Sequence, residues 1–84
     1  MKVIEKLWFA NIGSCIGIVV GEDELTKERK AYIRTVFGDN EETDTQFVLD
    51  QGSPFPLEMV GRLRNALMKG DKSHAQNYKI KNLH

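Results

Sequence analysis

The stretch CIGIVV at residues 15–20 is continuously apolar and rich in β-branched side chains. Such a run favours a β-strand that is buried on both faces or placed centrally in a sheet. Before it, Val3–Ala10 has the composition of a first strand, and Asn11–Ser14 that of a turn, because Asn and Gly tolerate positive φ. After it, the charged loop Glu22–Glu28 leads to a third strand at Lys30–Phe37. So short a connection favours antiparallel pairing.

A helix is expected after the third strand. The segment Gly38–Asn40 breaks that strand and offers an N-cap, and acidic residues follow where a first helical turn would lie. Gly52 supplies a stop about three turns later. The segment Glu41–Gln51 is therefore interpreted as a helix. A strand through Thr45–Leu49 remains an open alternative, since Thr, Phe and Val favour strands.

The segment Ser53–Pro56 reads as a rigid connector that leads to the clearest helix of the chain. Pro56 suits the first position of a helix, where its missing N–H costs nothing. The pattern of Leu57–Lys69 is helical, and Gly70 closes it. A second short helix is therefore expected after the connector.

With 84 residues, the chain is long enough for one domain with a modest core. The pattern predicts a single α+β domain over residues 1–70. In it, a small antiparallel sheet of three or four strands packs on two short C-terminal helices. Residues 71–84 read as a polar C-terminal tail, in which Tyr78–Ile80 is a candidate short edge strand.

Charge and cysteine content restrict the class of protein. Twelve basic and twelve acidic residues cancel, which argues against a dedicated binder of duplex DNA or of anionic membranes. The single cysteine, Cys15, cannot form an internal disulfide, so a reducing compartment fits. No signal peptide is visible, and the longest apolar stretch, Ile12–Val20, is too short to span a bilayer. We expect a cytoplasmic protein without membrane contact.

The sequence carries no recognisable catalytic motif. Its histidines, His74 and His84, lie in the tail without partners at metal-ligand spacing. Cys15 has apolar neighbours, which is typical of a structural cysteine rather than an activated nucleophile. The turn Asn11–Gly17 precedes a strand and matches no phosphate-binding motif, and the acidic cluster Asp39–Asp44 lacks the spacing of a calcium loop. We expect no enzymatic activity, no metal and no cofactor.

The helix expected at Leu57–Lys69 is more apolar than one packing face requires. On a wheel of about 100° per residue, its polar residues form one narrow stripe. The apolar arc spans roughly 220°, whereas a single face needs about 100°. Either the helix lies deep in its own core, or a second copy of the chain covers part of it. We expect a homo-oligomer, since lone domains of this size are often marginally stable.

Arg64 is the exception within that apolar arc, where it lies among Val60, Leu57 and Met68. A buried guanidinium needs a carboxylate, a phosphate or a route to water along its aliphatic stem. Three interpretations fit the sequence equally. Arg64 forms an internal ion pair with Asp44, captures an anionic ligand, or extends into water at the edge of the arc.

The order of elements resembles that of a known family. A hairpin-rich sheet precedes two helices, and the chain carries, in this order, Gly38-Asp39, Asp44, Gly52 and Phe55-Pro56. Over residues 3–69, this order is similar to the small phage anti-defence proteins of the Thoeris anti-defence sponge family. The resemblance implies a protein that sequesters cyclic nucleotide signals between its subunits without catalysis.

A protein of that kind needs only a preformed pocket, with arginines for phosphates and aromatic side chains for bases. The candidate ligand-binding residues are Arg64, Arg62, Arg34, Trp8 and Phe55. The leading hypothesis is therefore a non-enzymatic oligomeric binding protein for a nucleotide-like small molecule.

Two alternatives belong to other classes. The chain could be a protein–protein interaction module or inhibitor that grips a host protein with its apolar helix at residues 57–69. It could also bind single-stranded nucleic acid, if aromatic side chains near Arg34 or Lys30 stack on bases. The neutral charge balance argues against nucleic acid.

Overall fold

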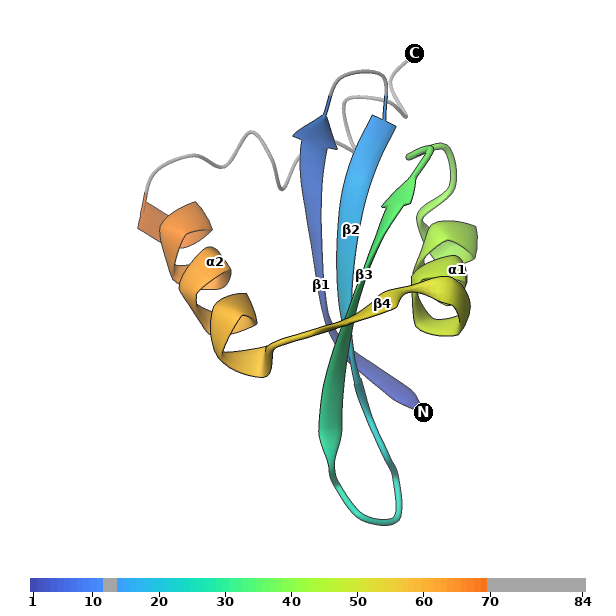
Figure 1. The fold of residues 1–84 in the computed structure, drawn as a ribbon, viewed down its shortest axis with the longest axis vertical. Coiled ribbons are helices and arrows are strands. Elements are labelled where there is room, and N and C mark those ends of the chain that lie inside the picture. The colour runs from blue at the N-terminus through green and yellow to red at the C-terminus, as the bar shows by residue number, and fades with distance from the viewer. Residues whose placement is uncertain (12–13, 70–84) are drawn as a thin grey trace.

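The computed structural model describes residues 1–11 and 14–69 of the chain. In these ranges it contains a four-stranded sheet with two helices (Figure 1), which confirms the predicted α+β class. The strands lie in the order in which they occur in the sequence, and neighbouring strands are antiparallel. The elements are β1 (Lys2–Asn11), β2 (Ser14–Glu22), β3 (Arg29–Val36), α1 (Glu41–Gln51), β4 (Ser53–Phe55) and α2 (Leu57–Lys69).

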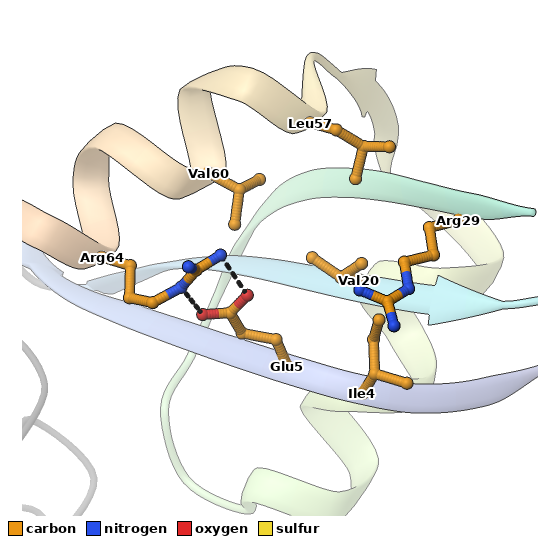
Figure 2. Close-up of a pocket in the computed structure, with 7 residues that line it drawn as sticks. All are labelled: Ile4, Glu5, Val20, Arg29, Leu57, Val60 and Arg64. Atoms are coloured by element: carbon orange, nitrogen blue, oxygen red, sulfur yellow. Dashed lines mark hydrogen bonds and ion pairs between the residues drawn. The ribbon is translucent and has the colours of Figure 1, made fainter.

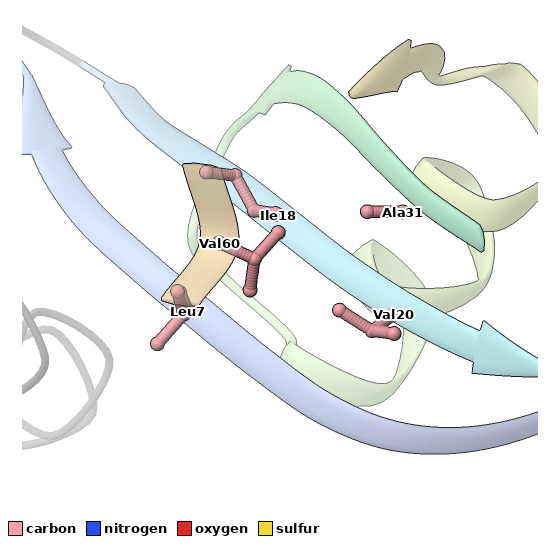
Figure 3. Close-up of a cluster of buried hydrophobic side chains, with 5 residues drawn as sticks. All are labelled: Leu7, Ile18, Val20, Ala31 and Val60. Atoms are coloured by element: carbon pink, nitrogen blue, oxygen red, sulfur yellow. The ribbon is translucent and has the colours of Figure 1, made fainter. Parts of the chain in front are cut away.

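The two helices cover opposite faces of the sheet, so the described part of the chain has three layers (Figure 1). Each face has its own apolar cluster. The cluster under α2 is centred on Val60 of that helix (Figure 3) and consists of Leu7, Ile18, Val20, Ala31 and Val60. The cluster under α1 consists of Trp8, Cys15, Val19, Val36 and Val48.

The strand β2 supplies side chains to both clusters, because successive residues of a strand point to opposite faces. Ile18 and Val20 face α2, and Cys15 and Val19 face α1. All four are buried. The prediction that this apolar run is a strand buried on both faces is therefore confirmed.

At Gly17 in β2, the cross-strand neighbour leaves no room for a side chain. It is paired with Trp8 of β1, and the indole ring lies across the space that a side chain at Gly17 would occupy. A Cβ at this position would lie 2.1 Å from the ring. Trp8 is buried as a result, with 4% of its surface exposed.

The helix α1 has the predicted bounds, so the alternative of a strand in this segment is wrong. The side chain of Asn40 caps the helix by accepting a hydrogen bond from the N–H of Thr43 at 3.0 Å. Gly52 ends it as predicted, but in an extended conformation rather than a left-handed one. Glycine is needed there because a Cβ would lie 2.3 Å from the carbonyl oxygen of Val48.

The segment predicted as a rigid connector contains the short strand β4. Its residues Ser53–Phe55 pair with the middle of β3 at Ala31–Ile33. A proline is tolerated in an edge strand because no outer neighbour needs its N–H. The helix α2 then begins at Leu57, and the carbonyl of Pro56 accepts the first helical hydrogen bonds. Pro56 therefore precedes the helix rather than occupying its first position.

The predictions for the tail, including the edge strand at Tyr78–Ile80 and the positions of His74 and His84, lie outside the described residues. Among the helices within those residues, none is long and apolar enough to cross a membrane.

Two glycine-to-alanine substitutions should have opposite effects on stability. We expect Gly17→Ala to lower the free energy of unfolding by about 2 kcal/mol, because the new methyl group overlaps the Trp8 ring. Gly61 lies inside α2, and a Cβ there meets no described atom within 4 Å. Gly61→Ala should therefore raise the free energy of unfolding by about 0.5–1 kcal/mol. Urea denaturation of both variants checks this, and a neutral Gly17→Ala would contradict the packing described.

Candidate functional site

A β-bulge near the start of β1 decides which side chains face α2. Val3 pairs with Gly21 and Glu5 with Val20, so Ile4 is an extra residue in β1. Because of the bulge, Ile4 and Glu5 both line the space under α2, although they are consecutive. A regular strand would turn one of them to the other face.

Arg64 of α2 reaches this edge of the sheet and forms a two-point ion pair with Glu5. Its Nε donates to Oε2 at 2.6 Å, and its Nη2 donates to Oε1 at 3.1 Å. The hydrogen bond from Glu5 and the charge of its carboxylate raise the pKa of Arg64 above its ordinary value. An arginine is charged throughout the physiological range in any surroundings, and Glu5 stabilises that charge further.

Of the three interpretations of Arg64, the ion pair with Asp44 is wrong. Asp44 lies on α1, on the opposite face of the sheet from α2. Its carboxylate accepts a hydrogen bond from the N–H of Gly38 at 3.0 Å and so ties the loop before α1 to that helix. The interpretation that Arg64 extends toward water fits better, since 48% of its side chain is exposed.

A hollow of about 200 Å³ lies between α2 and the sheet beside this ion pair (Figure 2). Arg64 and Arg29 stand on either side of it, with apolar side chains between them. The lining residues are Ile4, Glu5, Val20, Arg29, Leu57, Val60 and Arg64.

A second hollow, of about 390 Å³, adjoins the first and shares Arg29 and Leu57 with it. The short strand β4 pairs with β3 only from Ala31 to Ile33. On the side away from β2, the edge of β3 at Arg29 and Lys30 therefore has no strand beside it among the described residues, and the hollow forms there. We call the two hollows together the Arg29 groove. The second is lined by Arg29, Lys30, Ala31, Tyr32, Pro54, Phe55 and Leu57.

The charged lining of the Arg29 groove is mainly basic. Arg29, Lys30 and Arg64 carry positive charge, and Glu5 carries the negative charge. Arg29 also pairs with Glu22, its Nε donating to Oε2 at 3.0 Å. Guanidinium groups beside apolar side chains suit a ligand that has an anionic group on an apolar or aromatic body, because their forked donors match carboxylate and phosphate oxygens.

The groove brings together two of the five residues proposed from the sequence, Arg64 and Phe55. Trp8 is buried on the α1 side of the sheet, and Arg62 is exposed on α2 and does not line either hollow. Arg29 was missed. It ends a charged loop, where nothing in the sequence distinguishes it from a solvated residue.

Arg34, the remaining candidate, contacts α1 instead of the groove. Its Nη1 donates to the carbonyl oxygen of Gln51 at 3.1 Å, and its guanidinium lies 5.0 Å from the centre of the Phe47 ring. The last turn of α1 has no basic residue of its own. Arg34 therefore supplies the positive charge that stabilises the C-terminal end of that helix.

Residues 1–11 and 14–69 contain no group of three or more His, Cys, Asp or Glu side chains that could hold a metal ion. Cys15 is fully buried in the cluster under α1. Its thiol is therefore closed to a substrate from solvent. The groove itself presents charged donors and apolar side chains to solvent.

The role assigned to Arg34 is testable by its effect on stability. We expect Arg34→Ala to lower the free energy of unfolding by about 1 kcal/mol, because it removes a hydrogen bond to a helix end and a cation–π contact. Arg62→Ala, at an exposed position on α2, is the matched control and should change the value by less than about 0.5 kcal/mol. Equal effects of both substitutions in urea denaturation would contradict this role.

Comparisons of the chain with protein-family models, with curated proteins and with solved structures found no match. The resemblance to the Thoeris anti-defence sponge family rests on element order, and it stays a prediction.

Proposed function

We propose that this chain is a non-enzymatic binding protein that sequesters a small anionic molecule of the nucleotide type in the Arg29 groove. The observation that carries the proposal is the placement of Arg29 and Arg64 on either side of an apolar hollow (Figure 2). Guanidinium groups held in this way bind phosphate oxygens through paired, charge-assisted hydrogen bonds.

The shape and lining of the groove support a nucleotide-like ligand over a bare inorganic ion. Its two hollows measure about 200 and 390 Å³, a size suited to a small organic molecule. The second hollow is lined by Tyr32, Pro54 and Phe55. Flat apolar side chains of this kind pack well against a base, while the arginines bind its phosphates.

The proposal predicts measurable binding of at least one nucleotide. Calorimetry of the wild-type protein against linear and cyclic mononucleotides and dinucleotides should give heat with some of them. Arg64→Gln and Arg29→Gln should each weaken that binding about tenfold, as expected for the loss of a charge-assisted hydrogen bond. Arg62→Gln removes the same charge from α2 outside the groove and should leave the affinity unchanged. A folded sample that gives no heat with any member of the panel would overturn the proposal.

A second candidate function, interaction with another protein chain, is favoured by a different observation. Leu57 and Met59 at the start of α2 are 44% and 38% exposed. Together with the mixed charges of the helix, they offer a surface that a second copy of this chain could cover. Homo-oligomer formation is therefore proposed alongside ligand binding, as the sequence pattern of α2 already suggested.

Light scattering coupled to size exclusion tests self-association. We expect the mass of a dimer or a larger assembly, and we expect Met59→Glu to shift it toward that of the monomer, because a charge replaces an apolar contact. Leu25, in the loop between β2 and β3, is 94% exposed, and Leu25→Glu is the matched control that should leave the mass unchanged. A wild-type protein that is monomeric at high concentration would defeat this candidate.

A further inference from the structure

The side chain of Glu5 occupies the Nε and Nη2 donors of Arg64, one of the two forks through which an arginine binds an anion. We propose that Glu5 is a built-in competitor, so that ligand binding to the Arg29 groove is an exchange of one anion for another at Arg64. This inference rests on the proposed function of the groove. It adds to that function a residue that sets the affinity and the choice of ligand.

The geometry of the pair is the geometry that a ligand would use. The two oxygens of the Glu5 carboxylate accept from Nε and Nη2 of Arg64 at 2.6 and 3.1 Å. A phosphate presents two oxygens to an arginine fork in the same arrangement. The carboxylate of Glu5 and an incoming phosphate therefore compete for the same two donors.

Strand alternation places Glu5 on the face under α2, because Leu7, two residues later in β1, lies in the cluster on that face. The bulge at Ile4 sets Ile4 and Glu5 on the same face of the sheet, so the carboxylate stands beside an apolar side chain at the border of the hollow (Figure 2). The side chain of Glu5 is 23% exposed. It is close enough to the interior of the groove to act on a ligand there and is still reached by water.

The exposure of the pair makes the exchange feasible. A buried ion pair would be costly to separate, because one charge would remain without a partner in a low-dielectric environment. Here, 48% of the Arg64 side chain and 23% of the Glu5 side chain are exposed, so water reaches both charges when they separate. Only the fraction of the protein in which Glu5 has released Arg64 can then bind the ligand. The apparent affinity is the intrinsic affinity multiplied by that fraction.

At the other end of the groove, a second arginine is paired with a carboxylate of the protein. Arg29 is held by Glu22 through a single hydrogen bond of 3.0 Å, and 59% of its side chain is exposed. A ligand that reaches both arginines must displace two carboxylates. A bare monoanion cannot do this, so the groove is expected to discriminate in favour of ligands with more than one anionic oxygen group.

The test measures the affinity for inorganic pyrophosphate by calorimetry in variants that remove one carboxylate. We expect Glu5→Gln to bind pyrophosphate about threefold more tightly than the wild type, the change expected when a partly exposed ion pair no longer competes. Glu41→Gln is the matched control. Glu41 pairs with Lys6 at 3.1 Å on the α1 side of the sheet, so this variant has the same net charge without opening the groove.

The outcomes separate this inference from the proposed function. Tighter binding in Glu5→Gln and unchanged binding in Glu41→Gln support the competitor. Binding that is equal or weaker in Glu5→Gln, with a nucleotide still bound by the wild type, overturns the competitor and leaves the proposed function standing. Absence of binding of any nucleotide and of pyrophosphate by every variant overturns both. If Glu5→Gln does not fold, Glu5→Ala takes its place with the same expected gain, since it also frees the donors of Arg64.

Discussion

The burial of β2 on both faces is the constraint on which the rest of the structure depends. Ile18 and Val20 need cover on one side of the sheet, while Cys15 and Val19 need it on the other. The chain meets this demand by placing one helix on each face, α2 over the first pair and α1 over the second. The crossing segment β4 follows from this, since the chain must pass from α1 to α2 across the edge of β3.

The two faces are covered unequally, and the candidate site is a consequence. On the α1 side, the loop before the helix and its C-terminal end are both tied down, by Asp44 and by Arg34. On the other side, α2 is held by Val60 and Leu63 in the apolar cluster and by the ion pair of Arg64 with Glu5. Where β4 ends and α2 begins, the sheet is left partly open, and basic side chains border the opening. Anion binding at this place would use charges that also hold α2 on the sheet.

Local features of the sequence predicted most of the fold. The apolar run of β2, the N-cap at Asn40 and the helical pattern of α2 depend on near neighbours, and each was interpreted correctly. The strand β4 was not predicted, because a proline cannot donate a hydrogen bond to a sheet and a proline-rich segment therefore argues against a strand. The pairing of Arg64 with Asp44, one of three open interpretations, was wrong for another reason: helical periodicity shows that a residue faces a sheet, but not which face of the sheet. Glu5 and Arg64 are brought together only by the three-layer arrangement, in which Glu5, like Leu7 two residues later, faces α2.

Side-chain NMR of the arginines tests most directly the proposal that an anion binds between Arg29 and Arg64. In a titration with adenosine 5′-diphosphate, the Nε–H resonances of Arg29 and Arg64 should shift together, and the shifts should saturate at one ligand per protein chain. The Nε–H resonance of Arg34, which lies against α1, should stay in place. Equal shifts of all three arginines, or no shift of Arg29 and Arg64, would contradict the account.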